Sequence, residues 1–160
     1  MDVSAVTQSL AHISIDWIIF LALAAIAAGD ALRSGVARPL ALSLAAGLAY
    51  VLYESLDTAI FASKLSSDSG FLQAALAGGL VVLTFILLYR MTDPFGINTS
   101  GIIGSIIAGF ATAIALVVMW QTLPFQSVWE FGAQFQSLFG ETYRLWWLIA
   151  AYGAFAFVRR

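Results

Sequence analysis

Three acidic residues lie near the ends of apolar stretches, where a carboxylate could take part in proton or cation chemistry. Asp16 stands at the start of the first stretch, and Glu54 and Asp57 lie one helical turn apart near the end of the second. Ionisable side chains at membrane depth are costly and often mark ion or proton pathways. The three acids therefore define a possible ion or proton site facing the outer leaflet. They also fit a solvated acidic rim that pairs with Lys64, which is the interpretation we favour.

The sequence contains no other recognisable set of reactive residues. It has one His and no Cys, so disulfide and thiolate chemistry are excluded. No phosphate-binding loop, nucleophile–His–acid set or metal-ligand spacing occurs in it. We therefore expect a protein that is not an enzyme and that holds no cofactor and no metal.

The composition is that of an integral membrane protein. Hydrophobic residues make up 61% of the 160 positions and charged residues 10%, whereas soluble domains carry about 25% charged residues. The net charge of −2 argues against a nucleic-acid partner. We expect one domain, residues 1–160, that is an all-α membrane protein with five transmembrane helices plus one interfacial amphipathic helix.

The expected fold is organised around Ser100–Trp120, which carries no charge over 21 residues and as a helix would extend about 31 Å. The other helices are expected to pack against it. The last apolar run, Leu145–Val158, has only 14 residues, or about 21 Å, but Arg144 and two terminal arginines flank it, so a spanning helix is favoured over a surface helix. The five expected spans are about 13–32, 39–60, 71–89, 100–120 and 144–158.

Small residues recur four apart in several of these stretches. Such spacing lets two helices approach closely in a membrane. On this basis Leu at Gly104 or Gly109 is expected to disrupt assembly. The residues predicted to form helix-packing faces are Ser100, Gly101, Gly104, Ser105, Ala108, Gly109, Ala74, Gly78, Gly79 and Gly47.

The segment of about 124–139 alternates between aromatic and polar residues with helical periodicity. This pattern predicts one short amphipathic helix in the membrane interface, ended by Gly140. Anchoring in the membrane interface is sufficient to explain its aromatic residues. The alternative is that these residues bind a lipid, a quinone-like ligand or a partner helix. The residues expected to make these contacts are Phe125, Trp129 and Phe135, together with Trp146 and Trp147 of the last span.

The arginines indicate an orientation. With five spans and the N-terminus outside, the inner segments carry five basic residues and the outer segments two, which obeys the positive-inside rule. In the first inner turn Asp30 is three residues from Arg33 and could pair with it, as an anchor rather than a functional site. The inner residues are Arg33, Arg38, Arg90, Arg159 and Arg160, and the outer ones are Lys64 and Arg144. We therefore expect a multi-pass protein of the inner (plasma) membrane with its C-terminus in the cytoplasm.

Three short motifs occur in a familiar order. Asp16-Trp17-Ile18-Ile19 opens the first helix, Arg33-Ser34-Gly35-Val36-Ala37-Arg38 forms the first turn, and Gly101-Ile102-Ile103-Gly104 precedes Gly109 in the fourth helix. Over about Ile15–Trp120 this order resembles the colicin V production protein family of small polytopic bacterial inner-membrane proteins. The resemblance implies a role in the envelope, linked to toxin export or envelope stress, and implies no catalytic residues.

Three functions are compatible with these features. The leading hypothesis is a non-enzymatic accessory or assembly subunit that packs against copies of itself or a larger membrane complex. The second is a small ion or solute channel or transporter that uses Asp16, Glu54 and Asp57. The third is a holin-like lesion former, which the size and the short spans suggest.

Overall fold

In the computed structural model, residues 14–57, 70–92 and 101–158 are described, and all of their regular secondary structure is helical. The all-α class is therefore confirmed for these residues. The helices are α2 (Ile15–Ser34), α3 (Ala37–Asp57), α4 (Gly70–Thr92), α5 (Ile102–Thr122), the short 3₁₀ helix η3 (Pro124–Ser127), α6 (Ala133–Phe139) and α7 (Glu141–Val158).

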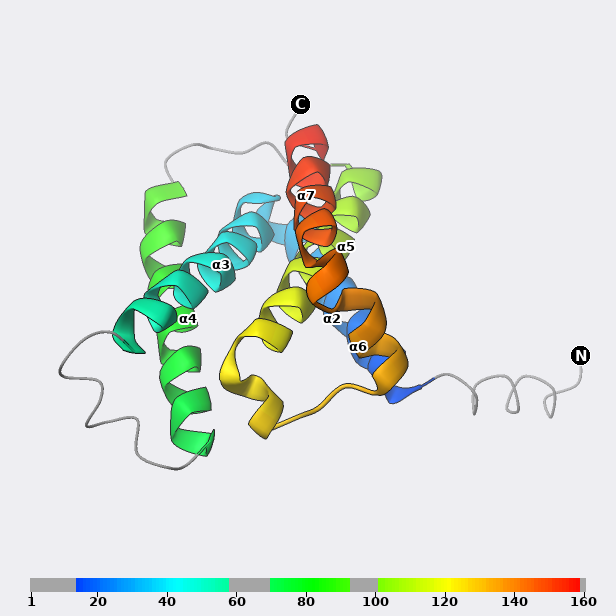
Figure 1. Cartoon of the computed structure of the whole chain (residues 1–160). Helices are drawn as coiled ribbons and strands as arrows, with labels where there is room; N and C mark the ends of the chain where they lie inside the picture. Colours follow the sequence, from blue (N-terminus) through cyan, green and yellow to red (C-terminus); the bar gives the residue numbers. More distant parts are fainter. Residues whose placement is uncertain (1–13, 58–69, 93–100, 159–160) are drawn as a thin grey trace, which may run out of the picture.

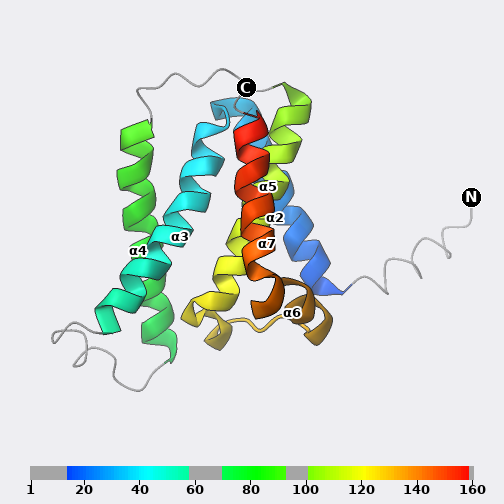
Figure 2. The ribbon, with the colours of Figure 1, turned by 45° about the horizontal axis from the view of Figure 1, so that its top comes forward.

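The five long helices alternate in direction (Figures 1 and 2). The start of α2 lies at the same end of the bundle as η3 and α6, and the end of α7 lies at the opposite end with the turn between α2 and α3. Gly35 forms that turn with φ 79°, a value that favours glycine, and its N–H donates to the carbonyl of Ala31 at 2.9 Å. The short connection makes α2 and α3 an antiparallel pair.

Helix α5 lies at the centre, as expected. Its small residues pack directly on α2, and a Cβ added at Gly109 would lie 2.7 Å from the Cβ of Ala28 and closer still to the carbonyl oxygen of Ala24. On another side of α5, Ala111 and Ala115 pack with Ala151 and Phe155 of α7. The small-residue spacing thus brings backbones together within this one chain.

Helices α3 and α4 form a second pair. The hydroxyl oxygen of Thr84 on α4 lies 3.1 Å from the carbonyl oxygen of Ala45 on α3, and its single proton is shared between that carbonyl and carbonyls of its own helix. Buried alanines on both helices, among them Ala41, Ala49 and Ala77, allow the close approach. At its N-terminal end α4 meets η3, where the Ser127 hydroxyl donates to the carbonyl of Gly70 at 3.0 Å.

The prediction of one helix over 124–139 is wrong. The segment is a 3₁₀ turn, a non-helical stretch and the seven-residue α6, which begins after Gly132. Its aromatic face is buried rather than interfacial, because Phe131, Phe135 and Phe139 pack with Phe20 and other residues of α2 and α5. The predicted end at Gly140 is confirmed.

The last helix is longer than its apolar run. Helix α7 starts at Glu141 and has 18 residues, which corresponds to about 27 Å. Helix α3 begins at Ala37, two residues before the expected Pro39, and residues 58–60 of its predicted span lie outside the described part.

Within the described ranges, three helices are long and apolar enough to cross a membrane: Ile15–Ser34, Gly70–Met91 and Ile102–Thr122. Apolar side chains on the outside of these helices support the same assignment, since Ile26 of α2 is 71% exposed and Leu83 of α4 is 53% exposed. The described part of the chain is therefore that of a helical membrane protein.

Candidate functional site

The carboxylate of Asp16 is buried and has a structural partner. Only 4% of this residue is exposed, and its Oδ2 accepts a hydrogen bond from the backbone N–H of Gly132 at 2.9 Å. Gly132 is the N-cap of α6, so the bond joins the start of α2 to the start of α6. The prediction that Asp16 belongs to a solvated acidic rim is wrong.

Glu54 has a different neighbourhood. It accepts a hydrogen bond from the Tyr50 hydroxyl at 2.6 Å on the exposed surface of α3, and the side chain of Asp57 lies outside the described residues. The end of α3 and the start of α2 lie on opposite flanks of the bundle in both views (Figures 1 and 2). The structure therefore does not bring Asp16 and Glu54 together. Within the described ranges no group of three metal-binding side chains occurs.

The bond from Asp16 makes a measurable contribution to stability. We expect Asp16→Ala to lower the free energy of unfolding by about 1–3 kcal/mol, because the Gly132 N–H then loses its partner. Asp16→Asn keeps an acceptor oxygen and should cost less. Denaturant titration followed by tryptophan fluorescence can measure this, since Trp17 lies against Phe135 with ring centroids 5.3 Å apart. Glu130→Ala on the exposed surface is the control, with an effect within about 0.5 kcal/mol. Equal effects of the two alanine variants would contradict the assignment.

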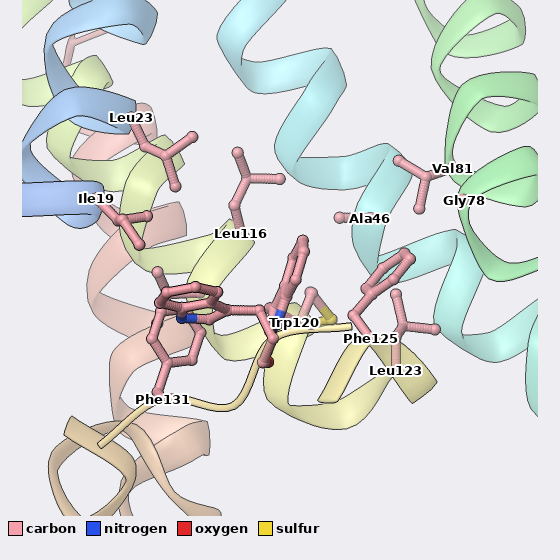
Figure 3. A pocket seen from close by; sticks show the side chains of 13 residues that line it. Ile19, Leu23, Ala46, Gly78, Val81, Leu116, Trp120, Leu123, Phe125 and Phe131 are labelled. Carbon is pink, nitrogen blue, oxygen red and sulfur yellow. Dashed lines mark hydrogen bonds between the residues drawn. The ribbon is translucent and has the colours of Figure 1, made fainter. Parts of the chain in front are cut away.

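An apolar groove of about 390 Å³ that could hold a ligand lies between α2 and α5 on one side and α3 and α4 on the other. Figure 3 shows Ile19 and Leu23 of α2 facing Val81 and Gly78 of α4, with Leu116 of α5 between them. Ligand pockets commonly have about 300–1,000 Å³ and mostly apolar walls. The remaining lining residues are Ala46, Val117, Met119, Trp120, Leu123, Phe125, Trp129 and Phe131.

Local sequence explains both the space and the aromatic side chains at one end of it. Gly78 and Ala46 carry little or no side chain, so α4 and α3 leave room where they face α2. At that end Phe125 of η3 stacks on Trp120 with ring centroids 4.8 Å apart, and the Trp120 indole N–H donates to the carbonyl of Trp129 at 3.1 Å. These contacts satisfy the polar indole nitrogen and leave apolar ring surface facing the groove.

A second cavity of about 260 Å³ adjoins this groove, and Leu23 and Leu116 line both. Its far end holds two charged side chains, Asp30 and Arg38. We use the name interhelical groove for the two cavities together. It has apolar walls, an aromatic end and a charged end.

The charged end is formed by three helices. Nη1 of Arg38 on α3 lies 3.5 Å from Oδ1 of Asp30 on α2, and Nε of Arg38 donates to the Tyr89 hydroxyl on α4 at 3.1 Å. The guanidinium also lies 5.0 Å from the centroid of the Tyr89 ring. The predicted pairing of Asp30 with Arg33 is replaced by this contact. Sequence reasoning missed it because Arg38 and Tyr89 are 51 residues apart.

The predicted packing residues have different environments. Ser105, Ala108, Gly109 and Ala74 are buried, and a Cβ at Gly47 would lie 3.4 Å from the Tyr152 hydroxyl of α7. Gly78 faces the groove and Gly104 is partly exposed. Gly79 and Gly101 make no such contact in the described part of the chain, because a Cβ there would meet no atom within 4 Å. Ser100 lies outside the described residues.

The aromatic residues predicted to lie in the interface also differ in their exposure. Trp129 and Trp146 are exposed, and Trp147 is half-buried with its indole N–H donating to the carbonyl of Leu138 at 2.8 Å. Phe125 lines the groove. Phe135 is buried in the core, so its assignment as an interfacial contact is wrong.

The fold and the groove of the described residues together define a class of protein: a helical membrane protein with an apolar groove between its helices. Comparison of the chain with family models, with curated proteins and with solved structures gives no match.

Proposed function

We propose that this chain crosses a bacterial inner membrane five times, with its N-terminus outside and its C-terminus in the cytoplasm. The alternating directions of the five long helices support this topology (Figure 2). Helices α3 and α7, with 21 and 18 residues, extend about 31 and 27 Å, which is close to the thickness of the hydrocarbon core. The positions of the arginines favour the turn between α2 and α3 on the cytoplasmic side.

Within that membrane the protein acts as a non-enzymatic accessory or assembly subunit of a larger complex or of an oligomer of this chain. The observation that carries this proposal is the outward face of α4. Gly79 and Ala75 are exposed there, one helical turn apart, and a Cβ at Gly79 would meet nothing within 4 Å. Val82 and Leu83 beside them are more than half exposed. A partner helix can approach the α4 backbone closely at this position.

The resemblance to the colicin V production protein family supports the same proposal from the sequence. What it implies is a complex in the cell envelope that serves toxin export or the response to envelope stress. The motifs that carry the resemblance fall in α2, the first turn and α5, which form the packed centre of the bundle.

The proposal predicts that Gly79→Phe abolishes assembly, because a bulky side chain at this position holds the partner helix away from the α4 backbone. Gly153→Phe on α7 is the matched control, since Gly153 is also an exposed helical glycine with nothing within 4 Å of an added Cβ. The measurement is native gel migration and chemical crosslinking after extraction in mild detergent. The wild type and Gly153→Phe should migrate as the same species, larger than a monomer. The Gly79→Phe variant should migrate as a monomer. A monomeric wild type, or unchanged assembly in Gly79→Phe, overturns the proposal.

A further inference from the structure

The interhelical groove keeps the same four helices along its whole length. On α3 it runs from Arg38 to Ala46, about 12 Å along the axis, and on α2 from Asp30 to Ile19, about 16 Å. Asp30 near the end of α2 and Arg38 at the start of α3 place the charged end beside the turn between these helices. Phe131, in the stretch that leads to α6, lies at the aromatic end (Figure 3). In the proposed topology the groove therefore starts at the cytoplasmic interface and reaches into the hydrocarbon core.

Its shape and walls suit a hydrocarbon chain. Between the two ends the lining side chains are almost all apolar, and at this depth the surroundings are lipid chains rather than water. The chemistry of the charged end then decides which lipid is held. An apolar chain alone would leave Arg38 and Asp30 without a role in recognition.

The charged end presents both signs of charge to a ligand. The side chains of Arg38 and Asp30 are 42% and 39% exposed and lie 3.5 Å apart. The described contacts of Arg38 use Nε and Nη1, and a guanidinium carries five N–H donors, so this partly exposed side chain has donors to offer a ligand. A phosphate can accept from these donors, while an ammonium beside it can donate to the Asp30 carboxylate.

From this arrangement we infer that the interhelical groove binds one acyl chain of a zwitterionic aminophospholipid, with the lipid phosphate on Arg38 and its ammonium on Asp30. An anionic phospholipid satisfies Arg38 but brings its negative charge next to Asp30, which is unfavourable at this distance. The inference rests on the proposed membrane topology. It does not depend on assembly with a partner.

The test uses the purified full-length protein in nanodiscs of equal parts phosphatidylethanolamine and phosphatidylglycerol with identical acyl chains. Native mass spectrometry after release into detergent counts the lipids that stay bound. We expect one retained phosphatidylethanolamine, in roughly tenfold preference over phosphatidylglycerol, as one additional charge-assisted contact provides. In Asp30→Asn the preference should fall to near unity, because the ammonium loses its charged acceptor.

Two adjacent glycines provide a matched control for the groove itself. Gly78 faces the groove, and a Cβ there would lie 3.9 Å from Phe125, an ordinary contact, so Gly78→Phe should fold and place its ring where the chain binds. Gly79 faces outward on the same helix. We expect Gly78→Phe to reduce lipid retention at least tenfold while it assembles normally, and Gly79→Phe to retain lipid like the wild type.

Several results would overturn the inference. One is equal retention of the two lipids by the wild type, or a preference for phosphatidylglycerol. Another is equal retention by Gly78→Phe and Gly79→Phe. Failure of the assembly proposal would leave the lipid result unchanged, because a monomer also contains the whole groove, so the two failures can be distinguished.

Discussion

Gly109→Ala is expected to destabilise the protein by about 3 kcal/mol or more, although it adds a single methyl group. The added Cβ would lie 2.7 Å from the Cβ of Ala28 and 2.8 Å from its backbone nitrogen, and would also overlap the carbonyl oxygen of Ala24. Two of these three atoms belong to backbone, so no side chain can rotate away and the helices must separate. Overpacking of this kind usually costs about 1–3 kcal/mol, and backbone contacts place this case at the upper end or above.

The matched control is Gly79→Ala, the same substitution where an added Cβ meets nothing within 4 Å. There we expect a change between zero and a gain of about 1 kcal/mol, since alanine has the higher helix propensity. Unfolding by sodium dodecyl sulfate, followed by circular dichroism, gives both free energies. A similar effect of the two substitutions would contradict the packing of α2 on α5.

The central position of α5 could be predicted because its cause is local. A run without charge identifies a helix, and small residues four apart identify the side that a neighbouring helix can approach. Ser105, Ala108 and Gly109 fulfil that expectation. The partner could not be predicted, because the spacing does not distinguish another helix of the same chain from another protein. The structure uses Gly109 within the chain, so a test of assembly at Gly109 would measure folding instead.

The segment after α5 shows why periodicity alone was insufficient. Phe131, Phe135 and Phe139 recur every four residues, a pattern that an interfacial helix and a buried one share. Their burial depends on Phe20, more than 100 residues earlier, and on the bond from Asp16 to Gly132. Contacts at such separations leave no trace in a local pattern.

The groove was beyond sequence reasoning for a related reason. The groove is the volume between four helices that their side chains do not fill. Its charged end brings together Asp30, Arg38 and Tyr89 from three of these helices. The sequence identifies the basic turn only as a topological anchor.

Helix α7 is longer than the sequence predicts, because its apolar run does not include the polar first turn of the helix. In that turn the N–H groups of Tyr143 and Arg144 donate to the Gly140 carbonyl.

The proposed function and the proposed lipid site both rest on five membrane crossings, and each crossing decides whether a given residue is accessible from outside the cell. The chain has no cysteine, so single cysteines can be introduced without removing any. Ser34, Asn98 and Arg160 fall on the expected cytoplasmic side, and Ser66 and Ser137 on the expected outer side. Ser34 and Ser137 are exposed in the structure.

The most direct measurement is therefore labelling of these five single-cysteine variants in intact cells with a membrane-impermeant maleimide, followed by labelling after the cells are opened. We expect Ser66→Cys and Ser137→Cys to react in intact cells, and Ser34→Cys, Asn98→Cys and Arg160→Cys to react only after opening. Reaction of Arg160→Cys in intact cells would show that α7 does not cross the membrane, and the reverse pattern at Ser34 and Ser137 would show the opposite orientation. Either result would contradict the account.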